Sequence, residues 1–79
     1  MDFTPRSGDL QVRGISWLPR MIDKARARHN DTLGEYMYPC PLDEQLLERL
    51  SIDAKSFEEL AVAYDDDEAI LDAVRQRKS

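Results

Sequence analysis

The segment 34–43, GEYMYPCPLD, gathers many of the side chains in this 79-residue chain that are capable of chemistry. The only cysteine, Cys40, stands between two prolines, and a thiol at a helix N-terminus faces backbone N–H groups that favour a nucleophilic thiolate. Asp43 and Glu44 oppose that negative charge, and the only histidine, His29, lies on another predicted helix. We therefore expect a structural Cys40, with a reactive or redox-sensing thiol as the alternative, and no catalytic residue.

Metal-binding and acid–base patterns are weak in this sequence. One cysteine and one histidine do not make the usual structural zinc set, and the acidic run 65–68 lacks the spacing and glycine of a calcium loop. We expect no metal and no cofactor. Glu35 and Asp43 flank the tyrosines and could act as an acid–base pair. Alternatively, Asp43 serves the first turn of a helix and Glu35 pairs with Lys24 or Arg20.

The helix that must position the basic side chains is predicted over residues 16–30, SWLPRMIDKARARHN. Ser16 is the expected N-cap, and Pro19 falls in the first turn, where its missing N–H costs little. Asp23 can pair with Arg20 or Arg26 along the helix. The apolar stripe expected to face the core consists of Leu18, Met21, Ile22 and Ala25. The basic residues that favour the helix C-terminus are Arg26, Arg28 and His29.

The string NDTLG at 30–34 is expected to break this helix, with Asn30 or Gly34 in a left-handed conformation. The tyrosine segment that follows is expected to be a short extended piece. Three short helices fit the rest of the chain, over residues 41–50, 53–64 and 65–78. Their expected inward residues are Leu42, Leu46, Leu47 and Leu50; Phe57, Leu60, Ala61 and Tyr64; and Ile70, Ala73 and Val74. Their expected N-terminal residues are Pro41, Asp53, and Asp65 with Glu68. The last helix should end in Arg75, Arg77 and Lys78.

These elements predict a mainly α protein: an extended N-terminal arm over residues 1–15, and a single four-helix domain over residues 16–79 with a Tyr/Pro-rich loop between helices 1 and 2. One cysteine excludes an internal disulfide, and together with the absence of a secretory segment it favours a cytoplasmic location. No apolar run approaches the ~20 residues of a membrane span.

Charge is distributed unevenly along the chain. Residues 1–30 carry six Lys/Arg and three Asp, a net of +3, whereas residues 31–79 carry five Lys/Arg and thirteen Asp/Glu, a net of −8. A basic surface for an anionic partner is one interpretation. We favour the other, in which the basic helix lies against acidic helices of its own or a neighbouring chain, because the acidic excess repels a polyanion.

Two strings, WLPRMIDKARA at 17–27 and GEYMYPCPLD at 34–43, followed by LLERLSID at 46–53, resemble a family of small bacterial proteins catalogued as domain of unknown function 5069. The resemblance covers residues 5–75. It implies no established activity, but it concentrates on the first helix and the tyrosine–proline loop. The candidate ligand or partner cluster at these positions consists of Trp17, Arg20, Asp23, Lys24, Glu35, Tyr36, Tyr38, Cys40 and Asp43.

We expect this cluster to be either a structural latch or a pocket. The favoured function is non-catalytic: binding of a protein partner or of a second copy of the chain. The alternative is a small-ligand or enzymatic pocket built from the first helix and the GEYMYPC loop. The weakest alternative is anion or nucleic-acid binding through the basic first helix, with Trp17, Tyr36 and Tyr38 as stacking platforms.

Overall fold

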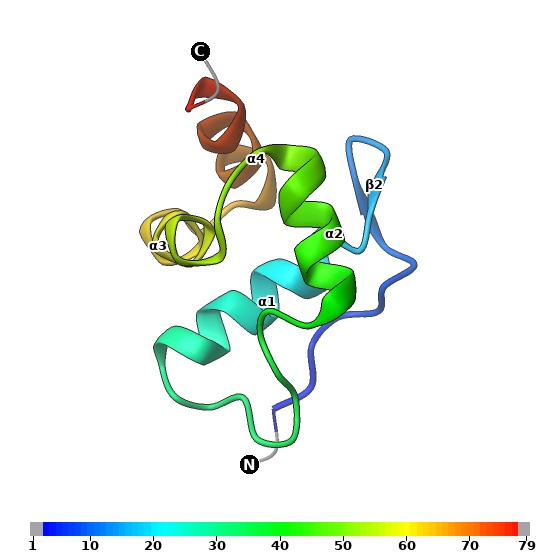
Figure 1. The fold of residues 1–79 in the computed structure, drawn as a ribbon, viewed down its shortest axis with the longest axis vertical. Coiled ribbons are helices and arrows are strands. Elements are labelled where there is room, and N and C mark those ends of the chain that lie inside the picture. Colours follow the sequence, from blue (N-terminus) through cyan, green and yellow to red (C-terminus); the bar gives the residue numbers. More distant parts are fainter. Residues whose placement is uncertain (1–2, 78–79) are drawn as a thin grey trace.

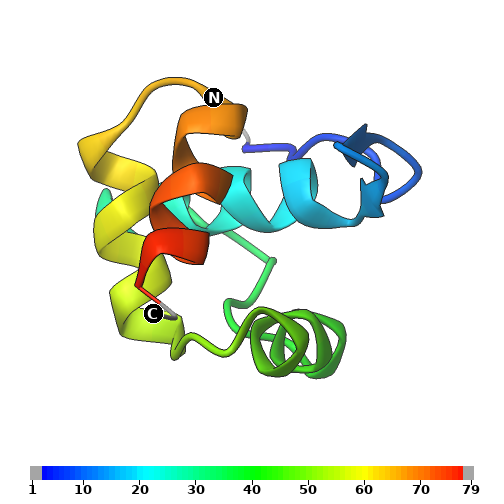
Figure 2. The same ribbon diagram turned by 90° about the horizontal axis from the view of Figure 1, so that it is seen from above.

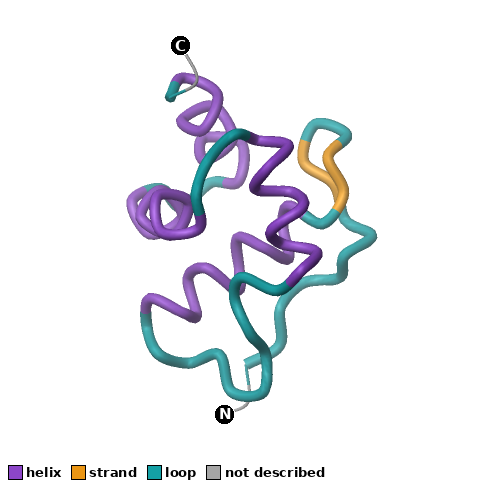
Figure 3. The backbone as a smooth tube through the Cα atoms, viewed as in Figure 1, coloured by secondary structure: helices purple, strands orange, loops and turns teal. Residues whose placement is uncertain are grey.

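A computed structural model describes residues 3–77 of the chain. Two short antiparallel strands, β1 (Gln11–Val12) and β2 (Ile15–Ser16), precede the helices, and Val12 pairs with Ile15. The helices are α1 (Leu18–His29), α2 (Pro41–Leu50), α3 (Ala54–Ala63) and α4 (Asp67–Gln76). Figures 1 and 3 show α2 crossing in front of α1, with the hairpin beside α2. The mainly α fold is confirmed, and the N-terminal arm contains a hairpin.

Helix α1 is central because it carries a broad apolar face. Leu18, Met21, Ile22 and Ala25 are fully buried, as the spacing of the stripe predicts. Helix α1 packs against α3, which in turn packs against α4, and β1 also contacts α1. Seen from above in Figure 2, α3 and α4 lie around one side of α1, and α2 lies on the other. The core therefore forms between α1 and the helices that surround it.

The predicted stripes of the later helices hold in part. Leu46, Leu47, Leu50, Phe57 and Ala61 are buried, but Leu42 and Tyr64 are exposed, so their inward placement was wrong. Leu42 lies in the first turn beside Asp43, and it is Asp43 that points inward. Tyr64 is the C-cap of α3, where the extended backbone has already left the helix. In α4 the expected Ile70, Ala73 and Val74 are buried, together with Leu71.

The residues at the helix ends agree with the prediction except at two N-caps. The N-cap of α1 is Trp17, in a left-handed conformation at φ 75°, and not Ser16; Ser16 belongs to β2. The N-cap of α4 is Asp66, whose carboxylate accepts from the N–H of Ala69, and not Asp65. Asp53 caps α3 as predicted. Pro41 begins α2 and Arg75 lies in the last turn of α4, while the predicted terminal Lys78 lies outside the described residues.

The connection between α1 and α2 turns twice through left-handed backbone. Gly34 has φ 62°, as expected, and Asp31 has φ 57°, whereas Asn30 at φ −90° does not take this conformation. In the tyrosine segment a turn at Gly34 and Glu35 precedes Tyr36 and Met37, a bend follows at Tyr38 and Pro39, and the segment pairs with no strand of the described chain. This connection brings Cys40 and the start of α2 back onto α1.

The basic and acidic halves of the chain meet within the molecule. Arg13 forms ion pairs with Glu68 and Asp72 of α4. Arg26 donates to three backbone carbonyl oxygens at the end of α3 and after it, those of Ala61, Tyr64 and Asp65. Much of the positive charge of residues 1–30 is thus bound by the chain itself. None of the helices in residues 3–77 is both long and apolar enough to cross a membrane.

Candidate functional site

A buried ion pair joins α1 to α2 at the centre of the predicted cluster. The Nζ of Lys24 lies 2.7 Å from Oδ2 of Asp43, with the two residues 3% and 0% exposed. Lys24 lies two turns into α1, and Asp43 is the third residue of α2, in the turn set by Pro41. Removing two charges from water costs several kcal/mol per ion, so buried charges are found with oppositely charged partners in close contact. One alternative from the sequence paired Glu35 with Lys24 or Arg20; in the structure the partner of Lys24 is Asp43.

Both carboxylate oxygens of Asp43 accept further hydrogen bonds. The indole Nε1 of Trp17 donates to Oδ1 of Asp43 at 2.7 Å, and the backbone N of Cys40 donates to Oδ2 at 3.0 Å. Cys40 is the N-cap of α2, as predicted, and it forms a capping box with Asp43. Its Sγ lies 3.2 Å from the Nζ of Lys24. Asp43 therefore binds one partner from α1, one from the residue before α1 and one from its own helix cap.

Arg20 lies between two aromatic rings next to this pair. Its guanidinium carbon is 5.2 Å from the ring centre of Trp17 and 5.5 Å from that of Tyr36, distances at which a cation is attracted to a ring face. Its Nη1 donates to the backbone oxygen of Arg6 at 3.2 Å, while its buried Nε has no hydrogen-bond partner. Arg20 thereby links the arm, α1 and the tyrosine loop.

Asp23 belongs to a separate network. It does not pair with Arg20 or Arg26 within residues 3–77; instead, it accepts from the backbone N and the Nε of Arg6, at 2.8 and 3.0 Å. The same guanidinium binds both carboxylate oxygens of Asp67 in α4. The hydrogen bond from Arg6 holds the pKa of Asp67 below its ordinary value, and the hydrogen bond to Asp67 raises the pKa of Arg6. This network fastens the arm to α1 and α4.

Tyr38 is part of the core. Its hydroxyl donates to the backbone oxygen of Ala54, at the start of α3, at 2.8 Å. Burial raises the pKa of Tyr38 above its ordinary value, and the carboxylate of Asp43 raises it further. The neutral hydroxyl therefore acts as a structural donor that holds the loop against α3.

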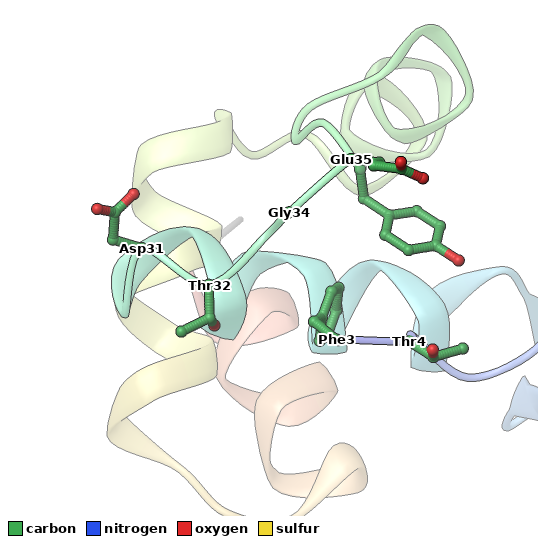
Figure 4. A pocket seen from close by; sticks show the side chains of 7 residues that line it. Phe3, Thr4, Asp31, Thr32, Gly34 and Glu35 are labelled. Atoms are coloured by element: carbon green, nitrogen blue, oxygen red, sulfur yellow. The ribbon is translucent and has the colours of Figure 1, made fainter. Parts of the chain in front are cut away.

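Glu35 lies at the edge of a surface hollow of about 530 Å³ between the arm and the loop. The hollow is lined by Phe3, Thr4, Asp31, Thr32, Gly34, Glu35 and Tyr36. Figure 4 shows Phe3 and Thr4 on the arm, across from the loop that carries Gly34 and Glu35, with the carboxylate of Asp31 turned away from them. The Phe3 and Tyr36 rings meet edge to face at 5.7 Å. Within the described chain, Glu35 forms no ion pair with Lys24 or Arg20.

The nine predicted residues thus divide into two groups. Six of them lie together, namely Trp17, Arg20, Lys24, Tyr36, Cys40 and Asp43. Asp23, Tyr38 and Glu35 lie in three other surroundings. Sequence reasoning missed Arg6, which holds two carboxylates at once. A single arginine in an irregular arm has no periodicity that could have identified it.

Chemically, the six-residue group is a closed network. The Lys24 ammonium is neutralised by Asp43, and the same carboxylate takes the nearby Trp17 and Cys40 donors. Residues 3–77 contain no group of three or more histidine, cysteine, aspartate or glutamate side chains placed to hold a metal ion. The arrangement therefore joins α1, α2 and the arm, and its polar atoms are largely used for that purpose.

Fold and network together define a small, mainly α protein whose arm and helices are joined by internal ion pairs. The family described as a domain of unknown function, DUF5069, matches residues 2–79, and the chain belongs to that family. The match includes both strings on which the resemblance was recognised. No curated protein was found to match the chain.

Proposed function

We propose that this protein is a non-catalytic protein-interaction module. The observation that carries the proposal is the exposure of Met37, a residue that is 61% exposed in the middle of the tyrosine loop. Its neighbours on both sides are held: Tyr36 by Arg20 and Phe3, and Tyr38 by Ala54. Methionine is a residue type that adapts to irregular partner surfaces. The anchored loop therefore presents the Met37 side chain to solvent, where a partner protein can contact it.

Further exposed apolar side chains support an interaction role. Leu42 is exposed in the first turn of α2, five residues beyond Met37, and Leu10 is exposed just before the hairpin. Single exposed apolar residues are normal on a soluble protein. Leu42 and Met37, however, belong to the segment 34–43 that also carries the family resemblance. We therefore assign the segment, and not the buried ion pair beneath it, to partner binding.

The charge arrangement favours a protein partner over a nucleic acid. Phosphate binding needs unoccupied cations on one face. Arg13, Lys24 and Arg26 are bound to carboxylates or carbonyls of the chain, and Arg20 lies between two rings. The stacking platforms that a single strand would use are occupied in the same way, because Trp17 and Tyr36 are the rings that Arg20 contacts.

The second candidate function is binding of a small ligand in the hollow beside Glu35. Its volume of about 530 Å³ lies in the range of ~300–1,000 Å³ that small-molecule sites occupy. The Glu35 carboxylate and the rings of Phe3 and Tyr36 would favour a cationic ligand. Asp31 and Glu35, which carry the charge of this hollow, are both exposed to solvent, and this places ligand binding behind the interaction role.

The proposal is tested by site-specific photocrosslinking in cells that produce the protein. A benzophenone amino acid replaces Met37, and in a control it replaces Glu59, a polar exposed residue of α3. We expect an adduct with a second polypeptide at Met37 and a much weaker one at Glu59. An adduct of twice the chain mass identifies a second copy. Equal yields at the two positions, or no adduct at Met37, would contradict the proposal.

A further inference from the structure

A second candidate surface lies away from the tyrosine loop, where the end of α2, the end of α4 and β2 meet. Figure 1 shows these three elements converging in the upper half of the molecule. They enclose a groove of about 290 Å³. Four of its lining residues are apolar and two are cationic: Ile15, Leu46, Leu50 and Val74, with Arg49 and Arg75.

The two arginines of this groove differ from most others in the chain. Within residues 3–77, neither Arg49 nor Arg75 forms an ion pair or a hydrogen bond through its side chain. By contrast, Arg6 and Arg13 each bind two carboxylates. In a chain with sixteen acidic residues and a net charge of −5, two unpaired guanidiniums form a local positive site beside one groove, whose lining includes the buried Leu46, Leu50 and Val74.

We infer that the groove binds a short segment of a partner protein in which carboxylates flank an apolar side chain. The inference rests on the proposed interaction function and names the chemistry of its partner. The volume lies just below the usual range for small-molecule sites, and it suits one or two apolar side chains. Guanidiniums match carboxylates with paired N–H donors, so Arg49 and Arg75 would hold the flanking acids.

Charge complementarity also fixes where such a segment can lie. The first turn of α2 carries Asp43 and Glu44, and the first turn of α4 carries Asp67 and Glu68, whereas the two groove arginines lie toward the other ends of these helices. The side chains of Arg49 and Arg75 therefore attract an acidic segment, whereas the carboxylates in the first turns of α2 and α4 repel it. Complementary charges of this kind determine orientation and partner choice more than raw affinity.

The inference is tested by panning random peptides displayed on phage against the immobilised full-length protein. We expect the enriched peptides to carry Asp or Glu beside apolar residues. The most enriched peptide is then synthesised with a fluorescent label, and its binding is measured by anisotropy. Arg75→Glu and Arg49→Glu should each weaken binding about tenfold, because attraction becomes repulsion. Arg28→Glu is the matched control: it makes the same charge change at an exposed arginine outside the groove.

Failure to enrich peptides, enrichment of peptides without acids, or equal weakening by Arg28→Glu would each overturn the inference. Circular dichroism must show that the variants remain folded. Sedimentation equilibrium tests whether the groove binds a second copy of the chain. A dimer that dissociates in the Arg75→Glu variant would show that it does, and would contradict the inference. The Met37 crosslink, repeated in the Arg75→Glu variant, separates the two proposals. If that adduct persists while the groove results fail, the interaction function stands without this groove.

Discussion

The carboxylate of Asp43 accepts hydrogen bonds from the Lys24 ammonium, the Trp17 indole and the backbone N of Cys40, with none of its surface exposed. Each of these donors comes from a different part of the chain. A buried charge with several hydrogen bonds contributes little net stability compared with apolar residues of the same shape. Removing one partner is costly, however, because the other charge is then left buried and unpaired.

We expect Lys24→Met to lower the free energy of unfolding by about 3–5 kcal/mol, as breaking a buried ion pair does. Urea unfolding followed by circular dichroism measures this change. Lys55→Met is the control, since Lys55 is exposed, and it should change stability by less than about 0.5 kcal/mol. Adding Asp43→Leu to Lys24→Met should restore part of the loss. A Lys24→Met variant as stable as the Lys55→Met control would show that the pair has no structural role.

At this scale the sequence indicated which residue types would gather but not which atoms would meet. Lys24 and Cys40 were predicted to lie in one cluster, and they are 3.2 Å apart. Glu35 was given as one alternative partner of Lys24 or Arg20, whereas the observed partner of Lys24 is Asp43. Asp43 lies on the same helical face as Leu46, Leu47 and Leu50, so the spacing within α2 already turns it inward. Its contact with Lys24, however, depends on how α2 packs on α1, and spacing within one helix does not supply that long-range information.

Among the elements, the N-terminal arm depends on a close approach between backbone and ring. The backbone N of Trp17 donates to the oxygen of Gly8 at 3.0 Å, so the arm is hydrogen-bonded to the residue that caps α1. A Cβ placed on Gly8 would lie 2.5 Å from Cε3 of Trp17. The ring cannot easily move aside, because its Nε1 is bound to Asp43 and Arg20 covers its face.

Gly8→Ala should therefore destabilise the protein by about 1–3 kcal/mol, the usual cost of overpacking. Thermal unfolding measured by tryptophan fluorescence is suitable, because Trp17 is the only tryptophan and reports on this contact. Asp9→Ala, at the exposed position next to it, is the matched control and should leave the melting temperature nearly unchanged. If the two variants have the same melting temperature, the arm does not pack on Trp17 in solution.

Helix positions were the most predictable elements because local signals define their ends. Pro41 and the leucine spacing set α2 at residues 41–50, which are its bounds in the structure. The start of α1 was misplaced by one cap residue, since Ser16 pairs in the hairpin before it can cap a helix. The strands have two residues each, which is too short for an alternation of apolar and polar residues to predict them. Their pairing depends on the turn at Arg13 and Gly14, both of which have positive φ.

Across the whole molecule, Arg6 joins the arm to α1 and α4 through Asp23 and Asp67. The lowered pKa of Asp67 means that its contribution to stability is present above the unfolded carboxyl pKa of ~3.9 and is lost as pH falls through the folded value. The free energy of unfolding should thus fall on acidification, in part because protonation of the Asp67 carboxylate breaks its ion pair with Arg6. Both side chains are partly exposed, so solvent reduces the effect.

Arg6→Met should lower the free energy of unfolding at pH 7 by about 1–2 kcal/mol, because charge-assisted hydrogen bonds to two carboxylates are lost. The difference from the unmodified protein should shrink below about pH 3, where the carboxylates are protonated in both. Urea unfolding at a series of pH values measures it. Arg28→Met removes an arginine without a carboxylate partner in the described chain, and it should show no such convergence. A difference independent of pH would mean that Arg6 acts by packing and not by charge.

The same arginine affects the order in which the molecule is assembled. During synthesis Arg6 leaves the ribosome 61 residues before Asp67, so the bond between them can form only after the start of α4 has emerged. Asp23, 17 residues along, is available much earlier. The arm can therefore settle first on α1 and be fixed in place only when α4 arrives. Contacts between residues so far apart in the sequence form late and make folding slower. The bond between Arg6 and Asp67 would therefore be among the last native contacts to form.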